Sequence, residues 1–337
     1  MKAVRVADDG SVSVVDVEVP KVGPGDALMR TAAAGICGSD LLDWYVRRKA
    51  GSILGHEVAG EIVEVGAEVG GFAPGDRVVP HHHAACGECA DCHNGRHVQC
   101  RQWRSSSLDP GGMAELVRVP AENLARDTWK IPASVSDEEA TFVEPLATVV
   151  KAFRRGGFEP SQSLLAVGAG TTGQLAIRLA RSAGAWRIGA ADRVASRLSV
   201  AQWSGTSEVF DVSEEPLGKR ARDPFDFVFV GPGKAEVLES ALATVAPGGT
   251  LLAFTMAAPE ERWTVSPNEL YFREVEIVPS YSAGPGDMRE ALSLIAARTL
   301  VVADLVTHRF PVARAGEAFE RAREPDGSMK VLLTFGR

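Results

Sequence analysis

The 337-residue sequence lacks any apolar stretch long enough to span a membrane, and its first residues lack the apolar core of a signal peptide. Basic residues are in the minority, since 36 Lys and Arg stand against 44 Asp and Glu and give a net charge of -8. That deficit argues against nucleic acid or an anionic membrane surface as a partner. No internal repeat or low-complexity segment is present. These absences predict an ordinary globular protein of the cytoplasm.

Cysteine is scarce, and its placement is uneven. Four of the five cysteines fall within fifteen residues, at Cys86, Cys89, Cys92 and Cys100. Four thiolates on one short loop can surround a tetrahedral zinc ion with every position filled, which is typical of a structural site. Two disulfides, or His93 and His97 replacing a cysteine, are the alternatives. Spacings this short favour the metal over two disulfides.

The length is sufficient for two domains. Residues 1–34 alternate apolar and polar side chains between turns rich in Gly and Pro, which is typical of an antiparallel β domain. Residues 111–117 return to strand after a loop. Residues 134–141 have the composition of a capped helix start, with Ser136 and Glu139 in capping-box spacing.

The second half of the chain has a different pattern. Apolar strands at residues 164–167, 225–230 and 250–254, with a helix around residues 235–245, predict a parallel sheet. The pieces after about residue 285 are too few to form a third core. We therefore expect them to return to the first domain.

A glycine motif follows the strand at residues 164–167 and opens a helix. Gly168, Gly170 and Gly173 form GxGxxG, and Asp192 ends the next strand nineteen residues after the last glycine. In this context backbone amides bind a pyrophosphate and the carboxylate binds ribose hydroxyls. A tight turn with a chance acid is the alternative. The expected cofactor-binding residues are Gly168, Gly170, Thr171, Thr172, Gly173, Asp192, Arg193 and Arg197.

Asp192 predicts NAD rather than NADP, because its carboxylate would repel a 2′-phosphate. Arg193 is the residue that argues the other way, since a nearby arginine can accommodate that phosphate. We interpret Arg193 as flanking the adenine or facing solvent.

Cys37, within the run Gly-Ile-Cys-Gly-Ser-Asp at residues 35–40, is followed nineteen positions later by His56 and Glu57. Thiolate, imidazole and carboxylate are the ligand types that hold a catalytic zinc with one position open. A buried cysteine and an ordinary core histidine are the alternative. The run His81, His82 and His83 is interpreted as a loop that could line a substrate cleft.

In this order the motifs resemble those of the zinc-dependent medium-chain alcohol dehydrogenases, over essentially the whole chain. Glu144, before Pro145 and Leu146, makes the sequence most similar to the sorbitol (polyol) and threonine dehydrogenase branch. The resemblance implies an α/β protein with a GroES-like, mostly antiparallel catalytic domain, residues 1–146 and 285–337. The catalytic domain would carry the zinc loop 86–100, and residues 147–284 would form a Rossmann, doubly wound coenzyme domain. It also implies a homodimer or homotetramer.

The resemblance further implies two zinc ions per chain and oxidation of a secondary alcohol, of polyol, cyclitol or amino-polyol type, with NAD. The catalytic zinc would be held by Cys37, His56 and either Glu57 or Glu144. Ser39 would relay the hydroxyl proton, and Asp40 would orient His56. Leu42 stands where the family commonly has a relay histidine, and Ser280 stands where the sorbitol enzymes carry an arginine that faces the polyol.

Two other functions fit the same fold. A zinc-free quinone reductase would need neither Cys37 with His56 nor the four-cysteine loop. A non-catalytic nucleotide-binding protein would keep the structural zinc and show no turnover with any alcohol. Metal analysis and an alcohol panel would separate these alternatives.

Overall fold

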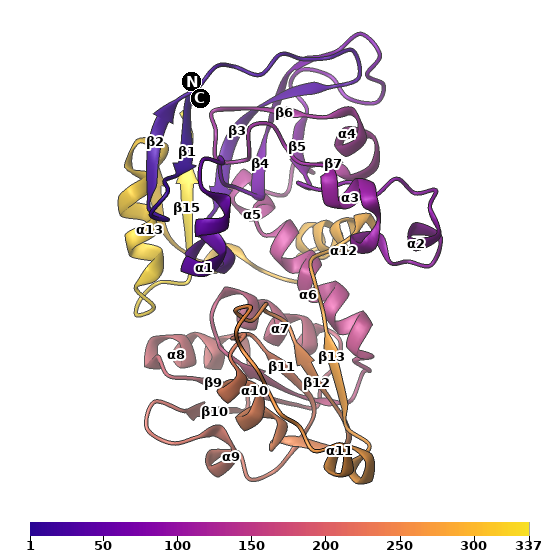
Figure 1. Ribbon diagram of the computed structural model, residues 1–337, viewed down its shortest axis with the longest axis vertical. Helices are drawn as coiled ribbons and strands as arrows, with labels where there is room; N and C mark the ends of the chain where they lie inside the picture. The colour runs from indigo at the N-terminus through magenta and orange to yellow at the C-terminus, as the bar shows by residue number, and fades with distance from the viewer. Residues whose placement is uncertain (337) are drawn as a thin grey trace. The chain divides into compact units, whose positions relative to one another are not determined.

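The computed structural model describes residues 1–336 and divides the chain into two compact units (Figure 1). The first unit comprises Met1–Ala147, Ala283–Glu324 and the chain from Lys330 onward. The second comprises Thr148–Ser282 and Pro325–Met329. Across residues 1–336, every helix is too short or too polar to cross a membrane.

The first unit is built on a seven-stranded sheet that is antiparallel except for one parallel pair, β14 with β15. In spatial order the strands are β14 (Val306–Pro311), β15 (Lys330–Thr334), β3 (Ala27–Gly35), β4 (Glu57–Val65), β5 (Arg77–Pro80) and β7 (Thr128–Lys130), with β6 (Leu116–Val119) also paired to β3. The last strand in the chain therefore lies beside β3, next to the Cys37 segment.

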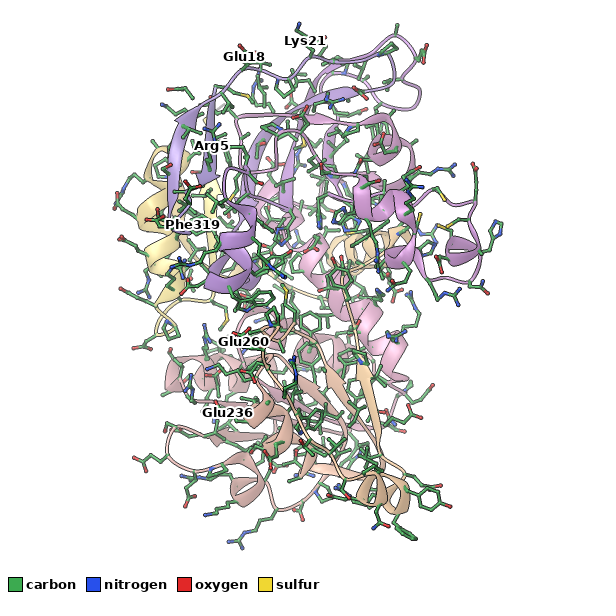
Figure 2. All side chains as sticks on the ribbon, viewed as in Figure 1. Arg5, Glu18, Lys21, Glu236, Glu260 and Phe319 are labelled. Atoms are coloured by element: carbon green, nitrogen blue, oxygen red, sulfur yellow. The ribbon has the colours of Figure 1, made fainter. Side chains whose placement is uncertain are left out.

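A two-stranded sheet of β1 (Lys2–Val6) and β2 (Val12–Asp16) completes the strands of this unit. Helix α13 (Ala315–Arg323) lies beside β2 and β15 (Figure 1), and it also packs against β14. Its Phe319, labelled in Figure 2, is buried in the apolar core that the two sheets share.

The helices of the first unit are short. They are α1 (Asp43–Val46), α2 (Ala90–His93), α3 (Arg101–Ser105), α4 (Ala121–Asp127), α5 (Asp137–Ala140) and α12 (Pro285–Ala296), besides α13, and 3-10 turns at Gly38–Leu41, Arg47–Lys49, His97–Gln99, Ala303–Leu305 and Val312–Arg314. The expected capping box is confirmed, since Glu139 N donates to Ser136 Oγ and Ser136 N donates to the Glu139 carboxylate. Helix α6 (Val143–Gly156) belongs to both units, because the boundary lies at Ala147.

The second unit is a six-stranded parallel sheet. Its spatial order is β10 (Glu208–Asp211), β9 (Arg187–Asp192), β8 (Ser163–Val167), β11 (Phe225–Val230), β12 (Val245–Ala253) and β13 (Glu276–Pro279). Its helices are α7 (Thr171–Ser182), α8 (Ala195–Ser204), α9 (Leu217–Arg220), α10 (Ala235–Leu242) and α11 (Pro267–Arg273). Counted in chain order the strands run 3-2-1-4-5-6, the doubly wound order of dinucleotide-binding sheets, and the order reverses between β8 and β11.

Two boundaries differ from the sequence-based expectations. The strand expected at residues 111–117 begins only at Leu116, because Gly111 and Gly112 pack irregularly against the backbone around Gly55. The helix expected around residues 235–245 ends at Leu242, since Thr244 O accepts a hydrogen bond from Phe225 N and the chain enters β12.

Candidate active site and zinc sites

The fold brings Cys37, His56 and Glu57 together. Cys37 follows the end of β3, His56 precedes β4, and these antiparallel strands pair Gly35 with Glu57. One ligand atom from each of the three side chains lies within 4.8 Å of the others. Gly55 permits the approach, because its φ is +105° and a Cβ there would sit 2.3 Å from Met113 N. The spacing that suggested a zinc site in the sequence thus becomes one cluster of donors.

Asp40 lies behind His56. Its carboxylate is buried, accepts a hydrogen bond from Cys37 N at 3.3 Å, and holds Oδ1 4.0 Å from His56 Nδ1. Burial opposes a charged imidazole, yet the negative charges of Cys37 and Asp40 raise the pKa of His56 well above its usual value. A bound cation would balance these negative charges, so the residues present fit a metal ion.

Glu57 has a partner that the sequence motifs did not reveal. Its buried carboxylate forms an ion pair with the ammonium group of Lys330, which also donates to Ile36 O at 3.3 Å. Lys330 is only 2% exposed and opens strand β15. A Cβ on Gly35 would lie 2.1 Å from a Glu57 oxygen, so a glycine is needed there. The negative charge of Glu57 is therefore balanced by the ammonium group of Lys330, a residue of β15.

Glu144 occupies a different part of the site. It lies in the first turn of α6, is 5% exposed, and places an oxygen within 4.8 Å of ring nitrogens of His81 and His82. Burial raises the pKa of Glu144, and the nearby charge of Glu57 raises it further. The structure thus groups Glu57 with Cys37 and His56, and Glu144 with the histidine run.

The three histidines have the irregular backbone expected of a loop, but they are packed into the unit. His81 is fully buried, and its Nδ1 lies 2.7 Å from Asp127 Oδ2. The His82 ring centroid is 5.2 Å from that of His56 and 4.2 Å from that of His83. His83 packs on Trp103 at 4.0 Å between ring centroids and makes a hydrogen bond through Nδ1 to Ser106 O. This run joins the Cys37 cluster to the cysteine loop.

The four cysteines converge as a separate site. Three pairs of sulfur atoms are 3.6 to 3.8 Å apart, and none of the four forms a disulfide. Four sulfurs at about 2.3 Å from a tetrahedral zinc would be about 3.8 Å apart, so the spacing fits that ion. The set is Cys86, Cys89, Cys92 and Cys100, without His93 or His97. A small apolar cluster that includes Val98 and Trp103 supports it.

Backbone amides lower the pKa of two of these cysteines, whereas burial raises the pKa of Cys92 to about 12. Hydrogen bonds from the amides of Glu88 and Cys89 lower the pKa of Cys86. Burial opposes the charge of Cys100, but the amides of Cys86 and Trp103 prevail and lower its pKa to about 6. Such amide donors to sulfur are what a zinc-bound thiolate set requires.

In the second unit, the glycine loop has the geometry of a dinucleotide cradle. Gly168 has φ +90°, and a Cβ on Gly173 would lie 1.9 Å from Gly168 O, so close packing of helix α7 on the loop requires both glycines. Gly170 caps α7 without a side-chain hydrogen bond. Thr171 Oγ1 donates to Met329 O at 2.8 Å. The loop and helix N-terminus fit a pyrophosphate.

Asp192 closes β9 and fixes this loop. Its buried carboxylate accepts hydrogen bonds from Ala169 N at 2.7 Å and Val194 N at 3.0 Å. A guanidinium nitrogen of Arg197 lies 3.9 Å from Asp192 Oδ2, whereas Arg193 is exposed. Each carboxylate oxygen has lone pairs left to accept from ribose hydroxyls.

Comparison with known proteins decides the family. The alcohol dehydrogenase GroES-like domain matches residues 23–132, and the zinc-binding dehydrogenase domain matches residues 171–297. The chain is 33% identical over 98% of both chains to D-altritol 5-dehydrogenase from Agrobacterium fabrum. It belongs to the zinc-dependent medium-chain alcohol dehydrogenase family. The predicted family and fold class are confirmed.

Two further comparisons extend over nearly the whole chain. Human sorbitol dehydrogenase is 30% identical over 96% of this chain and 93% of its own length. A zinc-binding dehydrogenase from Sinorhizobium meliloti, solved with NADP, has a TM-score of 0.88 and 28% identity, covering 99% of this chain and 98% of its own. The protein is therefore an oxidoreductase of the dehydrogenase type.

The sequence motifs did not reveal Lys330 or Asp127. Lys330 opens an apolar strand, and Asp127 ends a short helix, so neither stands in a recognisable motif. A lysine at the start of a buried strand was the one available signal, because a buried charge requires a partner.

Proposed function

We propose that the protein oxidises a secondary alcohol of polyol, cyclitol or amino-polyol type to a ketone, with NAD as the oxidant. The hydroxyl group gives up its proton, and the carbon that bears it gives up a hydride, so that NAD becomes NADH. The observation that carries this proposal is the convergence of Cys37, His56 and Glu57 within 4.8 Å in a chain that also has a dinucleotide cradle.

We assign Cys37, His56 and Glu57 as the residues that would hold a catalytic zinc ion, because their donor atoms form one cluster. When bound, zinc supplies a Lewis acid that favours loss of the hydroxyl proton, and NAD supplies a hydride acceptor. Asp40 orients the imidazole of His56 through its carboxylate at 4.0 Å. Glu144 is assigned to the second group of donor atoms, which it forms with His81 and His82.

Ser39 is assigned to proton transfer. It lies two residues after Cys37 on the turn Gly38–Leu41 and is half-buried, so it is close in the chain to a cluster residue and partly open to solvent. Leu42, three positions on, offers no group that could carry a proton. The relay in this chain would therefore pass through a hydroxyl rather than an imidazole at that position.

The proposed cofactor is NAD, although one relative of known structure was solved with NADP. Asp192 is held at the end of β9 by two backbone amides, and it cannot swing away from a 2′-phosphate without losing both hydrogen bonds. Within residues 1–336, Arg197 is the only arginine that forms an ion pair with Asp192, and that carboxylate partly offsets the charge of Arg197. Repulsion between a carboxylate and a phosphate in a cleft favours NAD.

We also propose that Cys86, Cys89, Cys92 and Cys100 hold a structural zinc ion. All four positions would be filled by sulfur, which leaves no place for a substrate. The role of this site would be to fold the loop around Trp103 and thereby support the histidine run packed on it.

Metal analysis with an activity screen tests the proposed function. The purified protein should contain two zinc ions per chain and form NADH with some member of a panel of polyols, cyclitols and secondary alcohols. Cys37→Ser should lose one zinc and the turnover together. A protein with no zinc would be a quinone reductase by this reasoning, and one with the structural zinc and no turnover would be a binding protein.

A further inference from the structure

A buried glutamine joins the glycine loop of the second unit to helix α8. Gln174, near the start of α7, is completely buried, and its side-chain amide has hydrogen-bond partners at both ends. Its Nε2 donates to Ala169 O at 2.9 Å and to Arg197 O at 3.4 Å, and its Oε1 accepts from Ser204 Oγ at 2.8 Å. Because these partners are enclosed with it, removing the amide would leave them without a donor or an acceptor in a place that water does not reach.

An amide side chain matches the three partners of Gln174. The nitrogen end faces two carbonyl oxygens, which accept, and the oxygen end faces a hydroxyl group, which donates. Ser204 Oγ in turn accepts from Arg178 Nε at 3.1 Å, so a chain of hydrogen bonds runs from a charged guanidinium group to the glycine loop. A glutamate would present only acceptors to the two carbonyl oxygens, and an apolar side chain would present no donor.

This chain of hydrogen bonds holds the peptide group between Ala169 and Gly170. The Ala169 N–H donates to Asp192 Oδ2 at 2.7 Å and the Ala169 carbonyl accepts from Gln174, so side chains hold both polar groups of this residue. A peptide group is planar and trans, so the Gly170 N–H points away from the carbonyl that Gln174 holds. Within residues 1–336 the Gly170 N–H makes no backbone hydrogen bond. Its direction is therefore fixed, and it is available to a ligand.

The same amide also holds the first turn of α8. Arg197 O is its second acceptor, and a guanidinium nitrogen of Arg197 lies 3.6 Å from the place where a Cβ on Gly170 would stand. Backbone amides at a helix N-terminus and a guanidinium group are both donors that bind phosphate oxygens. Gln174 thus fixes the backbone behind two donor groups, the Gly170 amide and the Arg197 side chain.

We propose that Gln174 is a positioning residue for the dinucleotide, which orients the Ala169–Gly170 peptide group and the backbone of Arg197 toward the pyrophosphate. Because Gln174 is completely buried, it acts through these groups and does not touch the cofactor. Donors that are held in place before binding avoid the entropy cost of ordering the loop, so they bind the cofactor more tightly. This inference rests on the proposed dinucleotide cofactor.

ADP-ribose is the probe that tests the proposal, because it carries the adenosine and the pyrophosphate of NAD and binds without turnover. Gln174→Met keeps an unbranched side chain of similar length and removes the amide. It should weaken the binding of ADP-ribose to the purified protein about tenfold, measured by isothermal titration calorimetry. With an accepted alcohol its KM for NAD should rise by a similar factor, while kcat should not fall below about half that of the wild type, as expected when uniform binding is lost.

Two further positions separate positioning from packing. Ser204→Ala removes the donor to the amide oxygen and should weaken ADP-ribose binding about threefold. The double variant should bind no more weakly than Gln174→Met, because both substitutions break the same chain of hydrogen bonds. Gln202→Met makes the same change as Gln174→Met at an exposed position of α8 and should bind as the wild type does. The Tm of each variant is measured as well, since a purely structural role would lower the Tm and leave the Kd of the folded protein unchanged.

An unchanged Kd for ADP-ribose in Gln174→Met would overturn the proposal whatever the Tm, as would an equal loss of affinity in Gln202→Met. A wild type that bound neither ADP-ribose nor NADH would overturn it together with the proposed cofactor. With binding intact, absence of turnover would overturn only the proposed reaction. If Gln174→Met does not fold, the wild type decides: saturating ADP-ribose should slow the exchange of the Gly170 N–H with solvent, followed by NMR, and an unchanged exchange rate would overturn the proposal.

Discussion

Replacing Lys330 with methionine should destabilise the first unit strongly. Lys330 is 2% exposed and Glu57 is 1% exposed, so in the metal-free protein the substitution leaves a carboxylate buried without its counter-charge. Removing one partner of a buried ion pair costs about 3–5 kcal/mol. In a folding unit of 150–250 residues that loss corresponds to a fall in Tm of roughly 6–20 °C. Methionine keeps an unbranched apolar chain against Phe142, whose ring centroid is 5.8 Å from the Lys330 ammonium group.

A double-mutant cycle separates the charge from the packing. Thermal and urea unfolding of the metal-free wild type, Lys330→Met, Glu57→Gln and the double variant would be followed by near-UV circular dichroism. The double variant should be more stable than Lys330→Met by at least about 1 kcal/mol, since the unpaired charge is gone. An unchanged Tm in Lys330→Met, or strictly additive effects, would show that this ion pair does not stabilise the first unit.

Three further predictions concern other parts of the chain. Cys89→Ser should lose one zinc per chain and lower the Tm, because a structural zinc contributes to folding directly, and full zinc content with an unchanged Tm would contradict the structural site. Burial lowers the pKa of His83 to about 4, so between about pH 6.5 and 4 the unfolded chain binds a proton that the folded chain does not. As the pH is lowered through that window, the free energy of unfolding should decrease by about 3 kcal/mol more in the wild type than in His83→Asn, measured by urea unfolding. Parallel curves for the two proteins would contradict the assigned pKa. Asp192→Ser should raise the ratio of kcat/KM with NADP to that with NAD by at least about tenfold, and an unaltered ratio, or a wild-type preference for NADP, would contradict the proposed cofactor.

Much of the fold and the site could be predicted because the residues that carry them stand in local motifs. Gly168 to Gly173 fix a turn by their own conformations, and Cys86 to Cys100 occupy one loop, so their spacing alone predicts the geometry. Cys37 and His56 required the fold to bring them together, and family resemblance supplied that step.

The missing parts are contacts between distant segments. Lys330 and Glu57 are 273 positions apart, and His81 and Asp127 are 46 positions apart. Their pairing depends on the order of strands in the sheet, which places β15 beside β3, and on the packing of α4 near β5. Periodicity shows which residues are buried but not which partner a buried charge meets. The same reason explains why the histidine run could be interpreted only as a loop.

We propose that hydride passes from the carbon of a secondary alcohol to NAD at a site that needs Cys37. The most direct measurement uses an accepted alcohol deuterated at the carbinol carbon, with zinc-loaded wild type and Cys37→Ser, and mass spectrometry of the cofactor and the ketone. We expect one deuterium in the reduced nicotinamide for each ketone formed by the wild type, and neither product with Cys37→Ser. Ketone without label in the cofactor, or full turnover by Cys37→Ser, would contradict it.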